Sequence, residues 1–277
     1  MDQYAINVGK FKVRDIHLNV AQIGKGEPLV FIHGWSNNWI GWKLLAHELA
    51  PHYRLHLIDL PGFGDSDRLE EYSLEILSHY IHDYIKEYAP TAKALIGGSM
   101  GTFLLAETIT KFDLDLKVVM IGTFFKKNNI GLLVDLYKQV LVFSSSSPSA
   151  QFIFEFIVRH PYSAYFVEKY LNSYEFNKQL VDTYQVPGRR KVNGKSYVQI
   201  GASMMNYKIE DLLKQINSET LLIFGSSDRY TSPKLAGSMV TKLNKKNITN
   251  VFVDKAGHCP AYEQPKKTAE LILKFLD

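Results

Sequence analysis

The chain has 277 residues, of which 46% are hydrophobic, and its formal net charge at pH 7 is +4. This length and composition suit one large α/β domain, with or without a smaller insertion, and exclude an intrinsically disordered chain. The charge is mild and the lysines occur in pairs rather than long runs. The sequence therefore does not indicate a nucleic-acid-binding surface.

Cysteine use and hydropathy limit where the protein works. Cys259 is the single cysteine, which excludes an internal disulfide and suits a reducing compartment. The first four residues lack the basic start and apolar run of a signal peptide. No stretch approaches the roughly 20 uninterrupted apolar residues of a membrane span. We therefore expect a cytoplasmic protein with no membrane span; the sequence does not predict its oligomeric state.

The first half of the chain alternates between strand and helix patterns. Residues 11–23 alternate in hydropathy and end near two glycines, which predicts an opening antiparallel hairpin. Short apolar runs predict strands at residues 29–32, 54–58, 94–96 and 117–121. Helical spacing predicts helices at residues 42–49, 73–88, with Ser73 as the N-cap, and 102–111. This alternation predicts right-handed crossovers and a mainly parallel sheet.

The alternation stops between residues 124 and 207, where helical, aromatic-rich segments occur without a clear strand. We expect a loop at the serine run 144–148 and a basic turn at residues 187–191. Strand and helix patterns then resume at residues 221–224, from 233, at 250–253 and from 265. The sequence therefore predicts an α/β core made of residues 1–123 and 208–277, with residues 124–207 as a helical insertion above the sheet.

Residues 97–101 read Gly-Gly-Ser-Met-Gly, a G-x-S-x-G pattern that follows a predicted strand and opens a predicted helix. In this context the pentapeptide indicates a nucleophile elbow, a sharp turn that exposes the hydroxyl of Ser99. Glycines at 97 and 101 let the strand and the helix approach each other closely.

An acid and a histidine follow Ser99 in the order that a hydrolytic triad requires. Asp228 lies just beyond the predicted strand 221–224, and His258 lies on the loop after the strand 250–253. Because a serine hydroxyl is a poor nucleophile at neutral pH, His258 would accept its proton and later return it. Asp228 would fix the imidazole tautomer and stabilise the imidazolium. The competing acid position after residue 121 holds Gly122 and Thr123, which favours Asp228.

A developing oxyanion needs preorganised N–H donors. We assign these donors to the backbone N–H groups of Met100, which follows the nucleophile, and of Trp35, on the loop after residues 29–32. His33 beside that loop and Asp59 at the end of a strand are expected to be structural.

Five segments carry a family resemblance, in the same order along the chain: 33–35, 59–66, 98–101, 225–228 and 257–258. With them the chain resembles the α/β-hydrolase superfamily, in particular the cap-bearing branch of esterases and C–C hydrolases that includes pimeloyl-carrier-protein methyl esterases. The resemblance implies an α/β-hydrolase fold with residues 124–207 as the cap. Thr102 replaces a glycine common in relatives, and Pro233 comes about one position late.

The sequence thus predicts a serine hydrolase that cleaves a carboxylic ester with an apolar, small-to-medium acyl group through an acyl-enzyme. No cofactor and no metal site are implied. Among the cap aromatics, Phe154 and Tyr165 are candidate substrate-binding residues. The main alternatives are a C–C hydrolase of β-diketone-type compounds and a ligand-binding or signalling protein on the same scaffold. The same residues would also serve a cofactor-free haloperoxidase or an acyltransferase.

Overall fold

The structure is a computed structural model that describes residues 4–125 and 131–277, with residues 131–135 described in their backbone only. Residues 1–3 and 126–130 lie outside the described part. The prediction that the chain has no signal peptide rests partly on the first range, and the predicted insertion includes the second.

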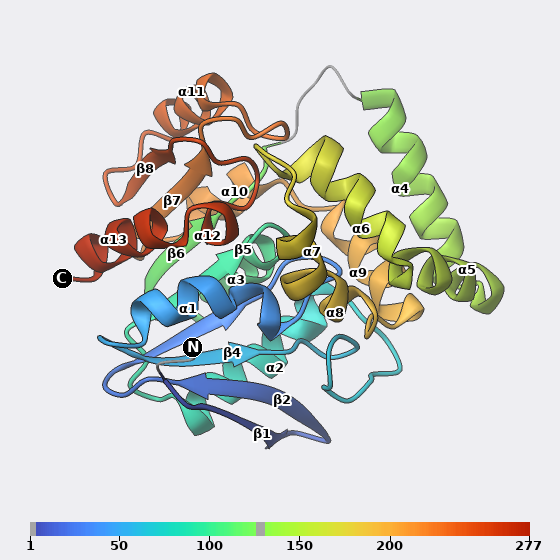
Figure 1. Ribbon diagram of the computed structural model, residues 1–277, viewed down its shortest axis with the longest axis horizontal. Helices are drawn as coiled ribbons and strands as arrows, with labels where there is room; N and C mark the ends of the chain where they lie inside the picture. The colour runs from blue at the N-terminus through green and yellow to red at the C-terminus, as the bar shows by residue number, and fades with distance from the viewer. Residues whose placement is uncertain (1–3, 126–130) are drawn as a thin grey trace.

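A single sheet forms the centre of the described molecule (Figure 1). Its strands in chain order are β1(Ile6–Val13), β2(Ile16–Ile23), β3(Pro28–Ile32), β4(Arg54–Ile58), β5(Ala94–Gly98), β6(Lys117–Ile121), β7(Thr220–Gly225) and β8(Ile248–Val253). The spatial order is β1-β2-β4-β3-β5-β6-β7-β8. β1 and β2 pair antiparallel, β2 meets β4 antiparallel, and all further neighbours are parallel. The predicted hairpin and mainly parallel sheet are confirmed.

The central strands are apolar along their length because helices cover both faces of the sheet. All residues of β3 are buried, whereas β1 at the edge alternates between exposed and covered positions. The core consists of two clusters of buried side chains, one on each side of the sheet. The helices of the α/β part are α1(Lys43–Leu49), α2(Leu74–Tyr88), α3(Met100–Phe112), α10(Ile209–Gln215), α11(Pro233–Leu243), α12(Pro260–Glu263) and α13(Pro265–Leu276).

Local sequence signals place several helix ends. The Ser73 side chain accepts a hydrogen bond from the backbone N–H of Ile76 and caps α2, as predicted. The helix predicted at 42–49 begins with the short helix η1(Trp39–Trp42), because the side chain of Asn38 caps that earlier turn. Neither α10 nor α12 was predicted, since both are too short to show a clear helical period.

Between β6 and α10 the described chain is helical, and these helices gather at one side of the sheet (Figure 1). They are α4(Gly131–Ser145), α5(Pro148–Arg159), α6(Pro161–Val167), the π-helical turn η3(Glu168–Asn172), α7(Lys178–Tyr184), α8(Val186–Arg189) and α9(Gly194–Met204). Below, this segment is called the cap; its boundaries at 124 and 207 stay a prediction.

Two predicted loops in the cap are shorter than expected. Ser144 and Ser145 form the last turn of α4, and Ser147 caps α5 through its side chain, so little of the serine run is loop. Residues 187–189 belong to the short helix α8 rather than to a turn. Pro187 fits because the first turn of a helix does not need its missing N–H.

In the described part of the chain, no single helix has the length and hydropathy to cross a membrane. α4 from Leu136 and α5 together pass that test of composition, but they are bent by 119° where they meet.

Candidate active site

Ser99 lies on the sharp turn between β5 and α3, with φ 50° and ψ −116°. This conformation is strained for a residue with a side chain, and strained residues cluster at functional sites. Neighbouring glycines make the turn possible. A Cβ on Gly97 would lie 2.7 Å from the Gly101 carbonyl oxygen, and one on Gly101 would collide with the Ile32 carbonyl oxygen at the end of β3.

The structure brings Ser99, His258 and Asp228 into one hydrogen-bonded line. His258 Nε2 lies 2.9 Å from Ser99 Oγ, and His258 Nδ1 lies 3.0 Å from Asp228 Oδ2. Because the carboxylate accepts from Nδ1–H, Nε2 is left free to accept a proton from the serine. The three residues come from the ends of β5, β7 and β8, which meet at the carboxyl edge of the sheet.

Two backbone groups fix the second oxygen of the acid. Asp228 Oδ1 accepts hydrogen bonds from the N–H groups of Tyr230, at 2.7 Å, and Thr231, at 3.1 Å. The side chain of Asp228 is fully buried, and the ring of Tyr230 packs 4.6 Å from the ring of His258. The carboxylate is therefore held with one oxygen directed at the imidazole.

The loop after β3 runs next to the nucleophile. A Cβ on Gly34 would lie 3.2 Å from the Gly98 carbonyl oxygen and 3.3 Å from Ser99 Cβ, so only glycine permits this approach without a shift. Trp35 and Met100 both line the cavity that contains Ser99. Among the described residues, neither backbone N–H donates to a protein acceptor. Both donors are thus available to a ligand.

The side chain of Trp35 connects this loop to the cap. Its indole Nε1–H donates to the Tyr197 carbonyl oxygen of α9 at 3.0 Å, and the two rings stack at 4.3 Å with an interplanar angle of 13°. Gly201, one helical turn further along α9, leaves room for the indole, which a Cβ would contact. No pattern in the sequence predicts this contact.

A cavity of about 550 Å³ lies between the cap and the carboxyl edge of the sheet, and Ser99 and His258 form part of its wall. Its apolar lining from the α/β part includes Trp42, Phe103 and Ile121. From the cap the lining includes Tyr137, Val167, Leu171 and Tyr197. The cavity is large enough for a small or medium-sized ligand.

The two cap aromatics expected to bind substrate do not line this cavity. Phe154 packs in a small cluster with Leu141 and Val198, and its ring lies 6.0 Å from that of Tyr197. The hydroxyl of Tyr165 donates to Asp182. Aromatic content alone could not distinguish these positions from Tyr137 and Tyr197, because the distinction depends on which helix face meets the sheet.

Glu168 and Arg189 also line the cavity, and both are buried. The sequence patterns did not predict either of them as a site residue. Burial raises the pKa of the Glu168 carboxyl and lowers that of the Arg189 guanidinium. Glu168 accepts hydrogen bonds from the side chains of Asn172, at 2.8 Å, and Ser173, at 3.1 Å. Each lies in a helical segment whose pattern gives no sign of a buried charge.

The backbone of the cap also supports the histidine loop. The N–H of His258 donates to the Asn172 carbonyl oxygen at 2.6 Å. Glu263 accepts from the N–H groups of Tyr174, at 2.6 Å, and Gly257, at 2.7 Å, so one carboxyl bridges the cap and this loop. Burial raises the pKa of Glu263 to about 7.

Cys259 adjoins His258 but is a poor second nucleophile. Burial and the nearby charges of Glu168 and Glu263 raise the pKa of its thiol well above the usual value. Since the thiolate is the reactive form, the thiol stays inert. Among the described residues, no group of three or more His, Cys, Asp or Glu side chains is arranged to hold a metal ion.

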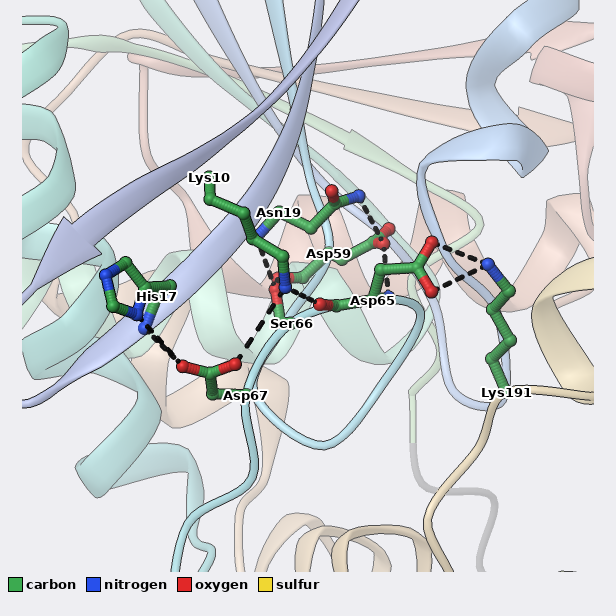
Figure 2. A network of polar contacts seen from close by, with 8 residues as sticks. All are labelled: Lys10, His17, Asn19, Asp59, Asp65, Ser66, Asp67 and Lys191. Atoms are coloured by element: carbon green, nitrogen blue, oxygen red, sulfur yellow. Dashed lines mark hydrogen bonds and ion pairs between the residues drawn. The ribbon is translucent and has the colours of Figure 1, made fainter.

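Asp59 organises the loop below the site (Figure 2). Its two oxygens accept hydrogen bonds from the Asn19 side chain, at 2.9 Å, and from the N–H groups of Asp65, at 2.9 Å, and Trp39, at 2.8 Å. Burial nevertheless raises its pKa to about 6. Lys191 of the cap pairs with the Asp65 carboxylate of this loop at 2.5 Å.

His33 is fully enclosed beside the loop after β3. Its Nε2 accepts from the Leu60 N–H at 3.1 Å, so its Nδ1–H donates to the Gly34 carbonyl oxygen at 2.8 Å. Burial lowers its pKa to about 4. Neither His33 nor Asp59 hydrogen-bonds to Ser99 or His258, in keeping with the structural roles predicted for them.

The α/β fold, the sharp turn at Ser99 and the hydrogen-bonded line of Ser99, His258 and Asp228 are together typical of α/β-hydrolases. The chain belongs to the Alpha/beta hydrolase family, whose profile matches residues 29–271. This confirms the resemblance seen in the sequence motifs.

Individual relatives agree with that assignment. The chain is 26% identical over 261 residues to a pimeloyl-[acyl-carrier protein] methyl ester esterase of Wigglesworthia glossinidia brevipalpis, covering 92% of this chain and 95% of that protein. The enzyme of the same name from Aeromonas salmonicida is 40% identical over 92 residues, 32% of this chain and 35% of that one. A solved esterase from Thermogutta terrifontis superposes with a TM-score of 0.76 at 18% identity, covering 98% of both chains.

Proposed function

We propose that the protein is a serine carboxylesterase that works through an acyl-enzyme. Ser99 attacks the ester carbonyl while His258 takes its proton; His258 then protonates the departing alcohol. Water, activated by the same imidazole, releases the acid and regenerates the serine. The observation that carries the proposal is the unbroken line Ser99 Oγ–His258 Nε2, 2.9 Å, and His258 Nδ1–Asp228 Oδ2, 3.0 Å.

The oxyanion assignment rests on position and availability. Trp35 and Met100 line the same cavity as Ser99, and no described acceptor occupies their backbone N–H groups. Donors fixed before the reaction cost no reorganisation when the charge develops on the carbonyl oxygen. Losing one such donor typically raises the barrier by about 3 kcal/mol.

The cavity favours an apolar acyl group of small to medium size. Its volume is about 550 Å³, and aromatic and aliphatic side chains dominate its wall. The relatives named for pimeloyl-carrier methyl esters support an ester with an aliphatic acyl chain. Ester cleavage is preferred to C–C cleavage because these relatives carry esterase names. The strained Ser99 argues against a passive ligand-binding protein, which has no need of that strain.

Fluorophosphonate labelling followed by a panel of esters with different acyl lengths tests the proposal. We expect Ser99-dependent labelling, preference for uncharged aliphatic acyl esters, and a loss of at least about 10⁴-fold in kcat for Ser99→Ala. The matched control is Cys259→Ala, which removes the only thiol and should keep the labelling. Labelling that survives Ser99→Ala, turnover only of charged acyl esters, or turnover of β-diketones with negligible ester cleavage would each contradict it.

A further inference from the structure

Exposed hydrophobic side chains are concentrated on the cap. Sixteen large hydrophobic side chains are exposed in the described part of the chain, and thirteen of them lie between residues 136 and 174. Single exposed hydrophobic residues are normal on a protein surface, but a contiguous group of this kind marks an interaction site. We call the exposed side chains of α4, α5, α6 and η3 the outer cap face; Figure 1 shows where α4, α5 and α6 lie.

The exposed residues follow helical spacing on each element. On α5 they include Phe152 and Phe156, which are 71% and 67% exposed. On α6 and η3 they include Tyr162, Phe166 and Tyr170, each four residues after the previous one. The opposite sides of the same helices carry the buried side chains that pack inside the cap. Each helix thus has a second apolar stripe that no described residue covers.

The charges of residues 136–174 are one-sided. Glu155 forms an ion pair with Arg159 at 2.9 Å, and Glu168 is buried, so neither carboxylate is free at the surface. Lys169 is exposed on η3, whereas Lys138 of α4 lines the cavity of the proposed active site. Lys169 Nζ lies 5.4 Å from the centroid of the Tyr170 ring. Among the side chains that the structure describes between residues 136 and 174, an aromatic and aliphatic face with an exposed lysine and no unpaired surface carboxylate complements an anionic lipid surface.

The outer cap face is continuous with the cavity of the proposed active site. Leu171 is 38% exposed on η3 and also lines the cavity, as does its neighbour Val167 on α6. An apolar chain that leaves a lipid surface at this point would meet hydrophobic side chains up to the cavity that contains Ser99.

A bilayer fits this face better than a protein partner does. Protein interfaces combine an apolar centre with a polar rim whose charges and hydrogen bonds select the partner. On this face the described residues 136–174 offer the exposed Lys169 and no unpaired carboxylate. α4 from Leu136 and α5 are together as apolar as a membrane span, but because of the 119° bend between them they do not form one straight span.

We propose that the outer cap face docks on the surface of a bilayer containing anionic lipid, and that the ester reaches Ser99 from that surface. The docking is independent of the proposed function, whereas delivery of a lipid-borne ester rests on it. Ser99→Ala protein should therefore bind vesicles like the wild type, so failure of the enzyme and failure of the docking can be told apart.

Vesicle flotation tests the docking. Vesicles of phosphatidylcholine alone are compared with an equimolar mixture of phosphatidylcholine and phosphatidylglycerol. We expect roughly tenfold stronger binding to the anionic vesicles, weakened by salt. Phe152→Ser/Phe156→Ser should weaken binding at least about tenfold, because two exposed aromatic anchors are lost. Both side chains are outside the catalytic machinery, so turnover of a water-soluble ester should be unchanged.

The matched control is Val8→Ser/Phe252→Ser, which removes two exposed hydrophobic side chains from β1 and β8, outside the cap. It should bind vesicles like the wild type. Equal loss in both double variants, no binding by the wild type, or equal binding to neutral and anionic vesicles would overturn the proposal. A dimer in sedimentation that the cap variant alone dissociates, without vesicle binding, would assign the face to a second copy of the chain instead.

Discussion

Ser99 has a backbone conformation that residues with side chains disfavour, at φ 50°. Such strain costs on the order of 1–3 kcal/mol and persists only where the surroundings enforce it. Here the Ser99 N–H donates to the Ile121 carbonyl oxygen at 2.9 Å, and α3 begins at the next residue. The strained turn directs the hydroxyl out of the strand–helix junction and toward His258.

Asp228→Asn replaces one carboxylate oxygen with an amide NH₂ group and tests whether the acid fixes the tautomer of His258. An asparagine can still accept from Tyr230 and Thr231, but its amide presents a donor to His258 Nδ1 and favours the wrong tautomer. We expect kcat to fall by about 10⁴-fold with little change in the free energy of unfolding. Asp254→Asn, on an exposed residue after β8, is the matched control and should retain activity. Comparable kcat values for the two variants would refute the assignment.

The junction of β3, β5 and α3 determines whether the elbow forms. Gly101→Ala should lower the free energy of unfolding by about 1–3 kcal/mol, because its Cβ collides with the Ile32 carbonyl oxygen and the helix must move. Activity should fall as well, since Met100 moves with the helix.

Gly237→Ala is the control for that substitution. Gly237 lies inside α11 and a Cβ there meets no atom within 4 Å. Alanine should therefore stabilise the protein by about 0.5–1 kcal/mol through helix propensity and chain entropy. Urea unfolding followed by circular dichroism measures both changes. Destabilisation of equal size at positions 101 and 237 would show that the close approach at the elbow is not the cause.

Separate contacts connect the cap to the α/β part. Trp35 bonds to and stacks on Tyr197, the Asn172 carbonyl oxygen accepts from the His258 backbone, and Lys191 pairs with Asp65 (Figure 2). The first two involve residues on the loops that carry the proposed oxyanion donor and base. The cap thereby contributes to positioning these loops as well as lining the cavity.

At the scale of the whole molecule, buried titratable groups give stability a pH dependence. The pKa of His33 is lowered by burial from 6.5 to about 4. Between these values the unfolded chain binds a proton that the folded protein does not, so acidification favours unfolding. His33 therefore lowers the free energy of unfolding by about 2 kcal/mol when the pH falls from 7 to 5. Asp59 acts in the opposite direction. Because its pKa is raised to about 6 in the folded protein, it stabilises the fold at low pH, and this stabilisation is lost as the pH rises through that value.

His33→Gln separates these two effects, because glutamine can still accept from the Leu60 N–H but does not titrate. The variant should be less stable than the wild type at pH 7, and the difference should shrink by about 2 kcal/mol at pH 5. Urea unfolding at both pH values measures it. Parallel pH profiles for the two proteins would show that His33 is not buried in its neutral form.

Local patterns in the sequence were sufficient for the sheet and the proposed triad. Apolar runs such as residues 29–32 in β3 and 221–224 in β7 mark strands covered on both faces, and the Ser73 cap fixes the start of α2. Ser99 directly follows β5, and Asp228 and His258 lie on the loops that follow β7 and β8. Because parallel strands end at the same edge of a sheet, predicting the strands also predicted that these side chains would meet.

The tertiary structure alone decided which cap side chains reach the cavity. Phe154 and Tyr165 are aromatic like Tyr137 and Tyr197, but helix packing turns the first pair away from the cavity and brings the second pair to it. Glu168 and Arg189 are likewise positioned by contacts between distant segments. The sequence determined the fold and the order of the proposed catalytic residues because those signals are local, whereas the cavity wall depends on how the cap helices pack against the sheet.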